Sequence, residues 1–260
     1  MVCNSVSILA SAHHGAIRIK LGAYAMRYLA IGNNAKTIKS DKGGEWLTAI
    51  LYLAPADTVE GINVCPMAEL AGCKEACLYT AGRGAFNNVQ QARISKTIAF
   101  RDDRDQFMRD IAADILTANR KAHKLGVRLA VRLNGTSDIA WENIPVANTG
   151  GNYQNIMAMF PDVQFYDYTK LPGRKTPTNY HLTVSYSGAN PKYAAKVHRS
   201  GHNVAVVFAS DRPARFIGRP TLDGDANDLR FLDSPGHVVA LTAKGKAKRD
   251  RTGFVVRNVA

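Results

Sequence analysis

The chain has 260 residues, of which 46% are hydrophobic, so it is long enough for one large domain with a substantial core. Its 34 Lys and Arg residues against 21 Asp and Glu residues give a net charge of +13, and such a positive potential attracts polyanions, nucleic acid first among them. The sequence contains no apolar run of about 18 residues and no Arg-rich amphipathic leader. We therefore expect a single domain over residues 1–260, no membrane span and a cytoplasmic protein.

The N-terminal part of the chain, residues 1–45, shows no regular hydrophobic period, and we expect an irregular basic segment there. Lys36, Lys39 and Lys42 lie in its turn-rich end and are candidates for contacts with DNA phosphates, although lysines in a loop are also often just solvated. Residues 46–53 then form a short apolar run that ends before Pro55, which predicts a buried strand.

Three of the four cysteines, Cys65, Cys73 and Cys77, lie in the loop that follows this strand. Three thiols cannot all pair, and a reducing compartment opens disulfides, so this arrangement favours a metal centre. Zinc and an iron–sulfur cluster such as [4Fe–4S] are both compatible with three thiolates, and the spacing does not choose between them. The alternative is three reduced cysteines that pack as small hydrophobic side chains.

The rest of the chain alternates between apolar runs and segments with helical spacing. This rhythm predicts an α/β fold with mostly parallel strands, arranged as a (β/α) barrel or partial barrel, with an open doubly wound sheet as the alternative. No dinucleotide-binding or phosphate-loop glycine motif follows any strand, which argues against a dehydrogenase or a nucleotide hydrolase. We expect helices at 87–100, 103–125, 152–160 and 191–199, and further strands at 127–133, 163–169, 181–186, 203–209 and 237–242.

Polar residues at the ends of the predicted strands are the candidates for catalysis, because these ends meet at one edge of a parallel sheet or barrel. Asp138 follows a strand directly and is our first candidate for a catalytic carboxylate, unless it serves as the N-cap of the next segment. Asp167 is the second; strand alternation predicts that it is buried and paired with Lys170 or an arginine. The candidates for substrate binding are Asn134, Ser137, Tyr186, Lys244 and Lys246.

Basic residues outside the N-terminal segment could hold a DNA backbone at the mouth of such a barrel. The chain ends in a strongly basic stretch, and further arginines precede it. The candidates for DNA contact are Arg83, Arg212, Arg215, Lys248 and Arg249, in addition to the three N-terminal lysines.

Several motifs resemble those of the bacteriophage gene-product-88-like family. They are residues 46–55, the cysteine loop from Asn63 to Gly84, residues 132–138 and residues 243–247, so the likeness covers roughly residues 34–250. A more distant similarity is to phage enzymes that exchange guanine in DNA for a 7-deazaguanine base, relatives of the tRNA-guanine transglycosylases. That resemblance implies an α/β barrel with a cysteine-held metal, and aspartates, here Asp138 and Asp167, that attack the sugar and recognise the base.

The position of the cysteines after the first strand differs from the transglycosylases, whose zinc site lies near the C-terminus and includes a histidine. It is similar instead to radical S-adenosylmethionine enzymes, although their Cys-x3-Cys-x2-Cys spacing is replaced here by Cys-x7-Cys-x3-Cys. The leading hypothesis from sequence is a phage DNA-guanine transglycosylase. The alternatives are an iron–sulfur enzyme that binds S-adenosylmethionine and a non-catalytic DNA-binding protein with structural zinc.

Overall fold

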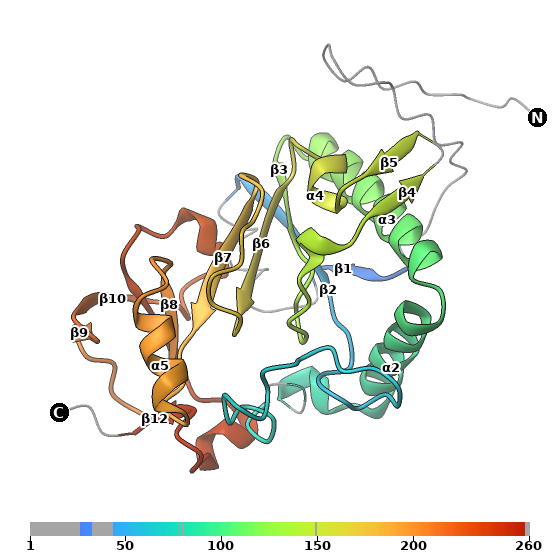
Figure 1. Cartoon of the computed structure of the whole chain (residues 1–260). Coiled ribbons are helices and arrows are strands. Elements are labelled where there is room, and N and C mark those ends of the chain that lie inside the picture. Colours follow the sequence, from blue (N-terminus) through green and yellow to red (C-terminus); the bar gives the residue numbers. More distant parts are fainter. Residues whose placement is uncertain (1–26, 33–43, 78, 80, 149, 258–260) are drawn as a thin grey trace, which may run out of the picture.

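The computed structural model describes residues 27–32, 44–77, 79, 81–148 and 150–257 (Figure 1). Lys36, Lys39 and Lys42 lie outside these residues. Six parallel strands form the centre of the sheet, and each pairs with the strand that follows it in this series. All six strands predicted from the sequence are thus confirmed, in the order β2 (Trp46–Leu51), β3 (Arg128–Arg132), β6 (Gln164–Thr169), β7 (Tyr180–Ser185), β8 (Val204–Phe208) and β11 (Val238–Thr242).

Shorter strands extend this sheet at both edges. The antiparallel strand β1 (Leu29–Ile31) pairs with β2, so part of the segment expected to be irregular is ordered. At the other edge β10 (Arg219–Asp223) pairs with β11, and β9 (Arg215–Phe216) pairs with β10. Among the described strands no pairing joins β1 to β9, so barrel closure remains a prediction.

The C-terminal strand β12 (Val255–Val256) enters the sheet between β7 and β8. β7 pairs with the start of β8 through Val184 and Ser185, whereas β12 pairs with the end of β8. Since β11 occupies the other side of β8, the carboxyl ends of β7 and β8 separate and β12 takes the space between them. This brings the basic C-terminal stretch to the carboxyl edge of the sheet.

The helices α2 (Asn87–Asp102) and α3 (Arg104–Lys124) lie between β2 and β3 in the chain, and α5 (Pro191–His198) lies between β7 and β8. α3 and α5 cover the same face of the sheet, because Leu182 packs in the core with α3 and Val184, two residues later on β7, packs with α5. The opposite face is covered by η4 (Arg230–Leu232), whose Phe231 packs on Trp46 and Tyr166.

The helix expected over residues 152–160 is reduced to one turn, α4 (Ile156–Met159). Residues Gly151–Tyr153 pair instead with β4 (Val146–Asn148) as β5 in a small hairpin. Asn155 caps α4 by accepting from the backbone N–H of Ala158, and Pro161 disfavours a helical conformation for the residue before it. The sequence pattern therefore overestimated this helix.

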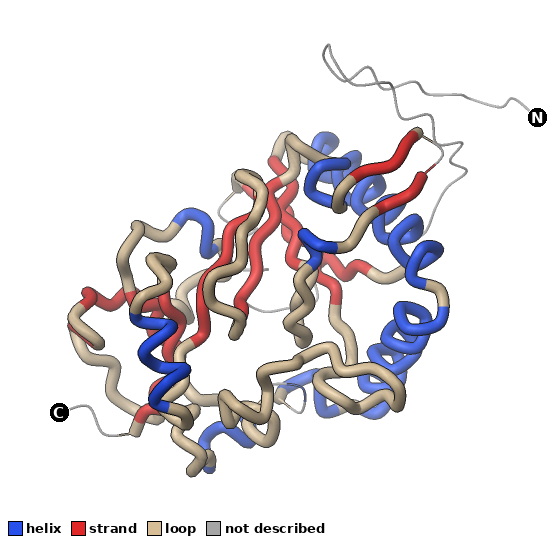
Figure 2. Tube along the Cα trace, in the orientation of Figure 1, coloured by secondary structure: helices blue, strands red, loops and turns tan. Residues whose placement is uncertain are grey.

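Most of the chain between β2 and α2 is loop, ending in the short η2 (Gly82–Ala85), and it crosses the bottom of the view from α2 to the C-terminal segment (Figure 2). Two further short helices, η3 (Trp141–Asn143) and η5 (Gly245–Arg249), follow β3 and β11. No helix of the described residues is long and apolar enough to cross a membrane.

Asp114 on α3 ties the edge strand to the core. Its carboxylate is buried and accepts hydrogen bonds from the backbone N–H groups of Arg27, Tyr28 and Leu29. We expect Asp114→Ala to lower the free energy of unfolding by about 3 kcal/mol, because it leaves several buried donors without an acceptor. Urea unfolding measures this change, and the exposed Asp162→Ala variant is the control. Equal effects of the two substitutions would contradict the role of Asp114.

Candidate functional site: a thiol cluster with a basic rim

The loop with the three cysteines is fixed to two other parts of the chain. The backbone N–H of Asp138 donates to the carbonyl of Val64 over 2.8 Å, which ties the loop to the end of β3. On the other side, the Thr252 hydroxyl donates to the carbonyl of Gly72 over 2.8 Å. Gly72 has a φ of +62°, and a Cβ atom there would lie 2.6 Å from the Thr252 oxygen, so the contact requires glycine.

All three thiols are free and partly buried. The Cys65 sulfur lies 3.7 Å from the carbonyl oxygen of Thr136, which follows β3. Burial raises the pKa of the Cys65 thiol to about 12 and also raises the pKa of Cys77. The electrostatic coupling of Cys65 with Cys77, and of Cys77 with Cys73, shows that the three groups are neighbours. Without a metal the thiols of Cys65 and Cys77 are therefore predominantly protonated at neutral pH.

Lys170 carries a positive charge into this cluster. Its backbone N–H follows β6 and donates to the Asp138 carboxylate over 2.7 Å, and its ammonium lies 5.5 Å from the centre of the Phe254 ring. Burial acts to lower the pKa of Lys170, but its electrostatic interactions with Cys73 and Asp138 outweigh it and raise the pKa above its usual value. Lys170 is a permanent cation beside the thiols.

Asp138 is buried at the carboxyl edge, as expected, but it is not an N-cap for the segment that follows it. One carboxylate oxygen accepts from the Thr169 hydroxyl over 2.7 Å and lies 3.6 Å from Arg174, and the other accepts from the Lys170 backbone. Both oxygens are thus engaged by protein groups.

Asp167 is also buried, and its partner is an arginine, one of the two kinds of partner expected. Arg132 lies 3.8 Å from one carboxylate oxygen, which also accepts from the backbone N–H of Asn134; the other accepts from the Tyr180 hydroxyl. Burial raises the pKa of Asp167 to about 7. Since the side chain is fully buried, Asp167 is placed to support the fold of the strand ends.

The predicted substrate-binding residues do not form one group. The Asn134 side-chain oxygen accepts from the Ser137 hydroxyl and from the Trp141 ring N–H, so both polar residues stabilise the turn after β3. Tyr186 packs edge-on against Phe216 instead. Lys244 forms an ion pair with Asp225 at 2.9 Å.

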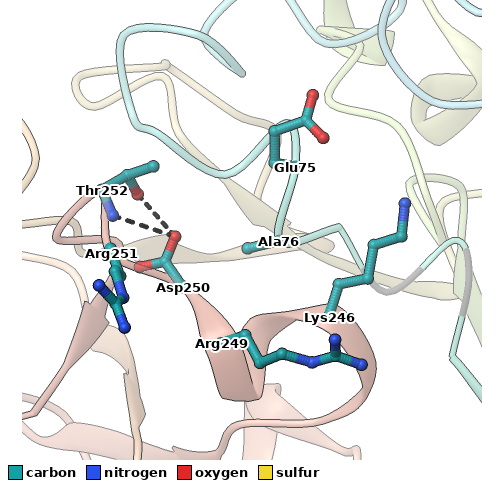
Figure 3. A pocket seen from close by; sticks show the side chains of 7 residues that line it. All are labelled: Glu75, Ala76, Lys246, Arg249, Asp250, Arg251 and Thr252. Carbon is teal, nitrogen blue, oxygen red and sulfur yellow. Dashed lines mark hydrogen bonds between the residues drawn. The ribbon is translucent and has the colours of Figure 1, made fainter.

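Lys246, in contrast, lines an open hollow of about 360 Å³ beside the cysteine loop (Figure 3). Among the described residues its ammonium has no hydrogen-bond or ion-pair partner, and the same holds for the side chains of Arg249 and Arg251. We call Lys246, Arg249 and Arg251 the basic rim. η5 holds it against the cysteine loop, because Ala247 packs on Ala76 in one apolar cluster. The lining consists of Glu75, Ala76, Lys246, Arg249, Asp250, Arg251 and Thr252.

The remaining predicted DNA contacts are scattered. Arg212 forms ion pairs with Asp223 and Asp225, and Arg215 donates to the carbonyl of Gly218. Arg83 is exposed on η2 and Lys248 on η5. The structure therefore brings together the cysteines, Asp138 and the η5 cations, but not the arginines near β9.

One basic residue of the site was not predicted from the sequence, whereas Arg251 belongs to the basic stretch, residues 244–251, that was expected to hold a phosphate backbone. Arg93 on α2 lies beside Cys77 and is buried, although its place in a polar helix segment gives no signal of this. Only the fold distinguishes it from a surface arginine.

The donor chemistry of the loop fits a thiolate-bound metal, since three free cysteines come from one segment. In this conformation no three His, Cys, Asp or Glu side chains of the described chain are grouped closely enough to hold a single metal ion. The loop would have to contract around a single zinc ion, whose thiolate bonds are only about 2.3 Å long. An iron–sulfur cluster is itself larger and demands less contraction.

The raised pKa of Asp167 predicts a pH dependence of stability. The unfolded chain releases this proton near pH 3.8, whereas the folded protein holds it up to about pH 7. The contribution of Asp167 is therefore full below pH 4 and lost as the pH rises to 7. We expect the unfolding free energy of wild type to fall over this range relative to Asp167→Asn, by about 2 kcal/mol or more. Urea titrations at several pH values test this, and a constant difference would contradict it.

The comparisons with known proteins bear on the family alone. Those with curated proteins and with solved structures found no match, and the likeness to the transglycosylases gains no support from them. A family model described as Gene product 88 matches residues 27–258, nearly the whole chain. The resemblance of the sequence motifs is thereby confirmed, and the protein belongs to the Gene product 88 family.

Proposed function

We propose that this protein is a DNA-modifying enzyme whose reaction centre is an iron–sulfur cluster held by Cys65, Cys73 and Cys77. The observation that carries the proposal is the position of the three free thiols, which follow the first of six parallel strands that pair in chain order. The carboxyl edge of such a sheet is where reacting groups gather in α/β enzymes. Three thiolates leave one iron of a four-iron cluster open, where S-adenosylmethionine would bind and supply radical chemistry.

The two aspartates favour this proposal over a transglycosylase. A carboxylate that attacks a sugar needs an oxygen free to approach the substrate. Both oxygens of Asp138 are hydrogen-bonded within the protein, and Asp167 is fully buried. Base exchange would require Asp138 to give up its contacts with Thr169 or with the Lys170 backbone, whereas cluster binding requires that the thiols deprotonate and that the cysteine loop draw closer, and leaves the Asp138 contacts in place.

DNA is the substrate that the charge distribution supports. The chain carries a net charge of +13, and three cations that have no partner within the described part of the chain line one hollow beside the cysteine loop. Cations that are not already neutralised by the protein are the ones that release counterions from a phosphate backbone. Ala76 lines the hollow and directly precedes Cys77 in the chain. A phosphate bound in the hollow would therefore lie close to the proposed cluster.

Metal analysis tests the centre directly. Protein purified without oxygen is expected to contain about four iron and four sulfide per chain and to show a broad absorption band at roughly 400 nm. Cys65→Ser, Cys73→Ser and Cys77→Ser should each lose most of this iron, because each removes one of three thiolates. Cys3→Ser, which changes the fourth cysteine of the sequence, is the matched control and should keep it.

Other results of the metal analysis would favour one of the two alternative functions. One zinc and no colour would contradict the iron–sulfur proposal. A base-exchange assay with labelled guanine and a 7-deazaguanine would then separate a transglycosylase from a structural-zinc protein that only binds DNA.

DNA binding tests the basic rim. We expect Lys246→Gln with Arg249→Gln to weaken binding of a duplex about tenfold at 0.1 M salt and to reduce the salt dependence by about one to two counterions. The control is Arg212→Gln with Lys244→Gln, which removes the same charge from cations already paired with acids. Fluorescence anisotropy at several salt concentrations measures both, and equal losses would contradict a specific role of the hollow.

A further inference from the structure

Phe86 places a large apolar ring in solvent. It is 60% exposed, and among the residues that the structure describes it is the only exposed aromatic one. The other aromatic rings of the described chain are buried or half-buried. Single exposed apolar residues are common on protein surfaces, so the meaning of this one depends on where the fold places it.

Phe86 occupies a helix position that usually carries a polar residue. It is the N-cap of α2, where Ser, Thr, Asp or Asn would accept from the first N–H groups of the helix, and its side chain makes no such bond. Its backbone N–H donates to the carbonyl of Arg83 over 3.2 Å, and the Gln90 side chain donates to the carbonyl of Gly84 over 3.2 Å, so α2 and η2 hold this turn from both sides. A residue that breaks two local rules and gains little burial in return indicates a functional position.

The turn before Phe86 lies against η5, which carries part of the basic rim. A Cβ atom at Gly245, the first residue of η5, would lie 3.0 Å from the Cβ of Ala81, the residue before η2 (Figure 1). Lys246 follows Gly245 directly, and Arg83 is exposed on η2 with no hydrogen-bond or ion-pair partner in the described part of the chain. Phe86 therefore stands at the end of a turn that extends the basic rim.

The two segments that meet at this contact favour a negatively charged partner. Residues 76–101 and 234–249 contain no Asp or Glu, whereas each carries several lysines and arginines. The acids that line the hollow, Glu75 and Asp250, directly border these segments, and Asp250 accepts hydrogen bonds from Thr252 and Val255. Proteins that bind unpaired nucleic acid combine cations along the backbone with aromatic rings under the bases. An exposed ring beside a phosphate-binding surface fits the flat face of a base.

We propose that Phe86 stacks on an unpaired base of the DNA whose phosphates the basic rim holds. The substrate class is then DNA with a nucleotide outside the helical stack, single-stranded or flipped, rather than an intact duplex. The inference rests on the DNA substrate of the proposed function, but not on a metal or on the reaction. Phe86 binds and orients the base and takes no part in bond making.

The test compares two forms of one probe, a duplex with one unpaired adenine and the same duplex with an abasic sugar in its place. We expect wild type to bind the first about tenfold more tightly, because the abasic form leaves the ring without a partner. Phe86→Leu should lose this preference and Phe86→Trp should keep it. Both should retain the wild-type salt dependence, since neither changes a charge. Fluorescence anisotropy at several salt concentrations measures all of these.

Leu125→Ala is the matched control, since Leu125 is 59% exposed and lies at another helix end, the C-cap of α3. Wild-type preference in Phe86→Leu, or an equal loss in Leu125→Ala, would overturn the inference. Phe86→Ser provides a second readout, because serine is a good N-cap. It should lose the preference while its thermal unfolding midpoint stays level or rises. A lower midpoint would show that the ring supports the fold, and would also count against the inference.

The outcomes separate this inference from the proposed function. A protein that holds zinc, yet loses the preference in Phe86→Leu, would overturn the iron–sulfur enzyme and support the stacking role. A protein with a cluster whose DNA binding depends on the basic rim but not on Phe86 would do the reverse. Absence of DNA binding by wild type, as expected if an acidic protein is the partner of this surface, would overturn both.

Discussion

The Asp138 carboxylate is the contact on which the geometry of the carboxyl edge depends. Its backbone N–H holds the cysteine loop through Val64, and its side chain holds the end of β6 through Thr169 and the Lys170 backbone. One residue thus fixes the distance between the thiols and the lysine that faces them. Because the carboxylate is buried, its removal leaves buried donors without an acceptor, and the end of β6 loses its anchor, while the backbone bond to Val64 still holds the loop.

A second constraint closes the site from the C-terminal side. β12 occupies the space where β7 and β8 separate, and this draws η5 and Thr252 onto the cysteine loop. The close contact between Gly72 and the Thr252 hydroxyl leaves no room for a side chain, so the two segments fit only in this arrangement. Two motifs that are about 170 residues apart in the sequence, and that both support the family resemblance, therefore form one surface.

The sequence predicted the central sheet well because its six strands are continuous apolar runs, as buried parallel strands require. It missed the β4–β5 hairpin, whose polar residues carry little strand signal, and the edge strands, which are too short for a period to show. The cysteine loop was located from residue type alone. Its partners were not, since Arg93 becomes a buried cation only when α2 packs beside the loop, and sequence spacing carries no information on that packing.

The two faces of the sheet differ in how their polar groups are engaged. On the face opposite the helices, η4 covers Trp46 and Tyr166, and Arg132 forms an ion pair with Asp228 at 3.0 Å, while buried atoms such as Trp46 Nε1 and Arg132 Nε have no hydrogen-bond partner among the described residues. On the helix side of the carboxyl edge, Thr169 and the Lys170 backbone donate to the Asp138 carboxylate, whereas the Cys65 sulfur has only a 3.7 Å contact with the carbonyl of Thr136. Protein contacts thus engage the carboxylate more fully than the thiol, and this difference supports our proposal that the cysteine loop, rather than the aspartates, binds the reacting group.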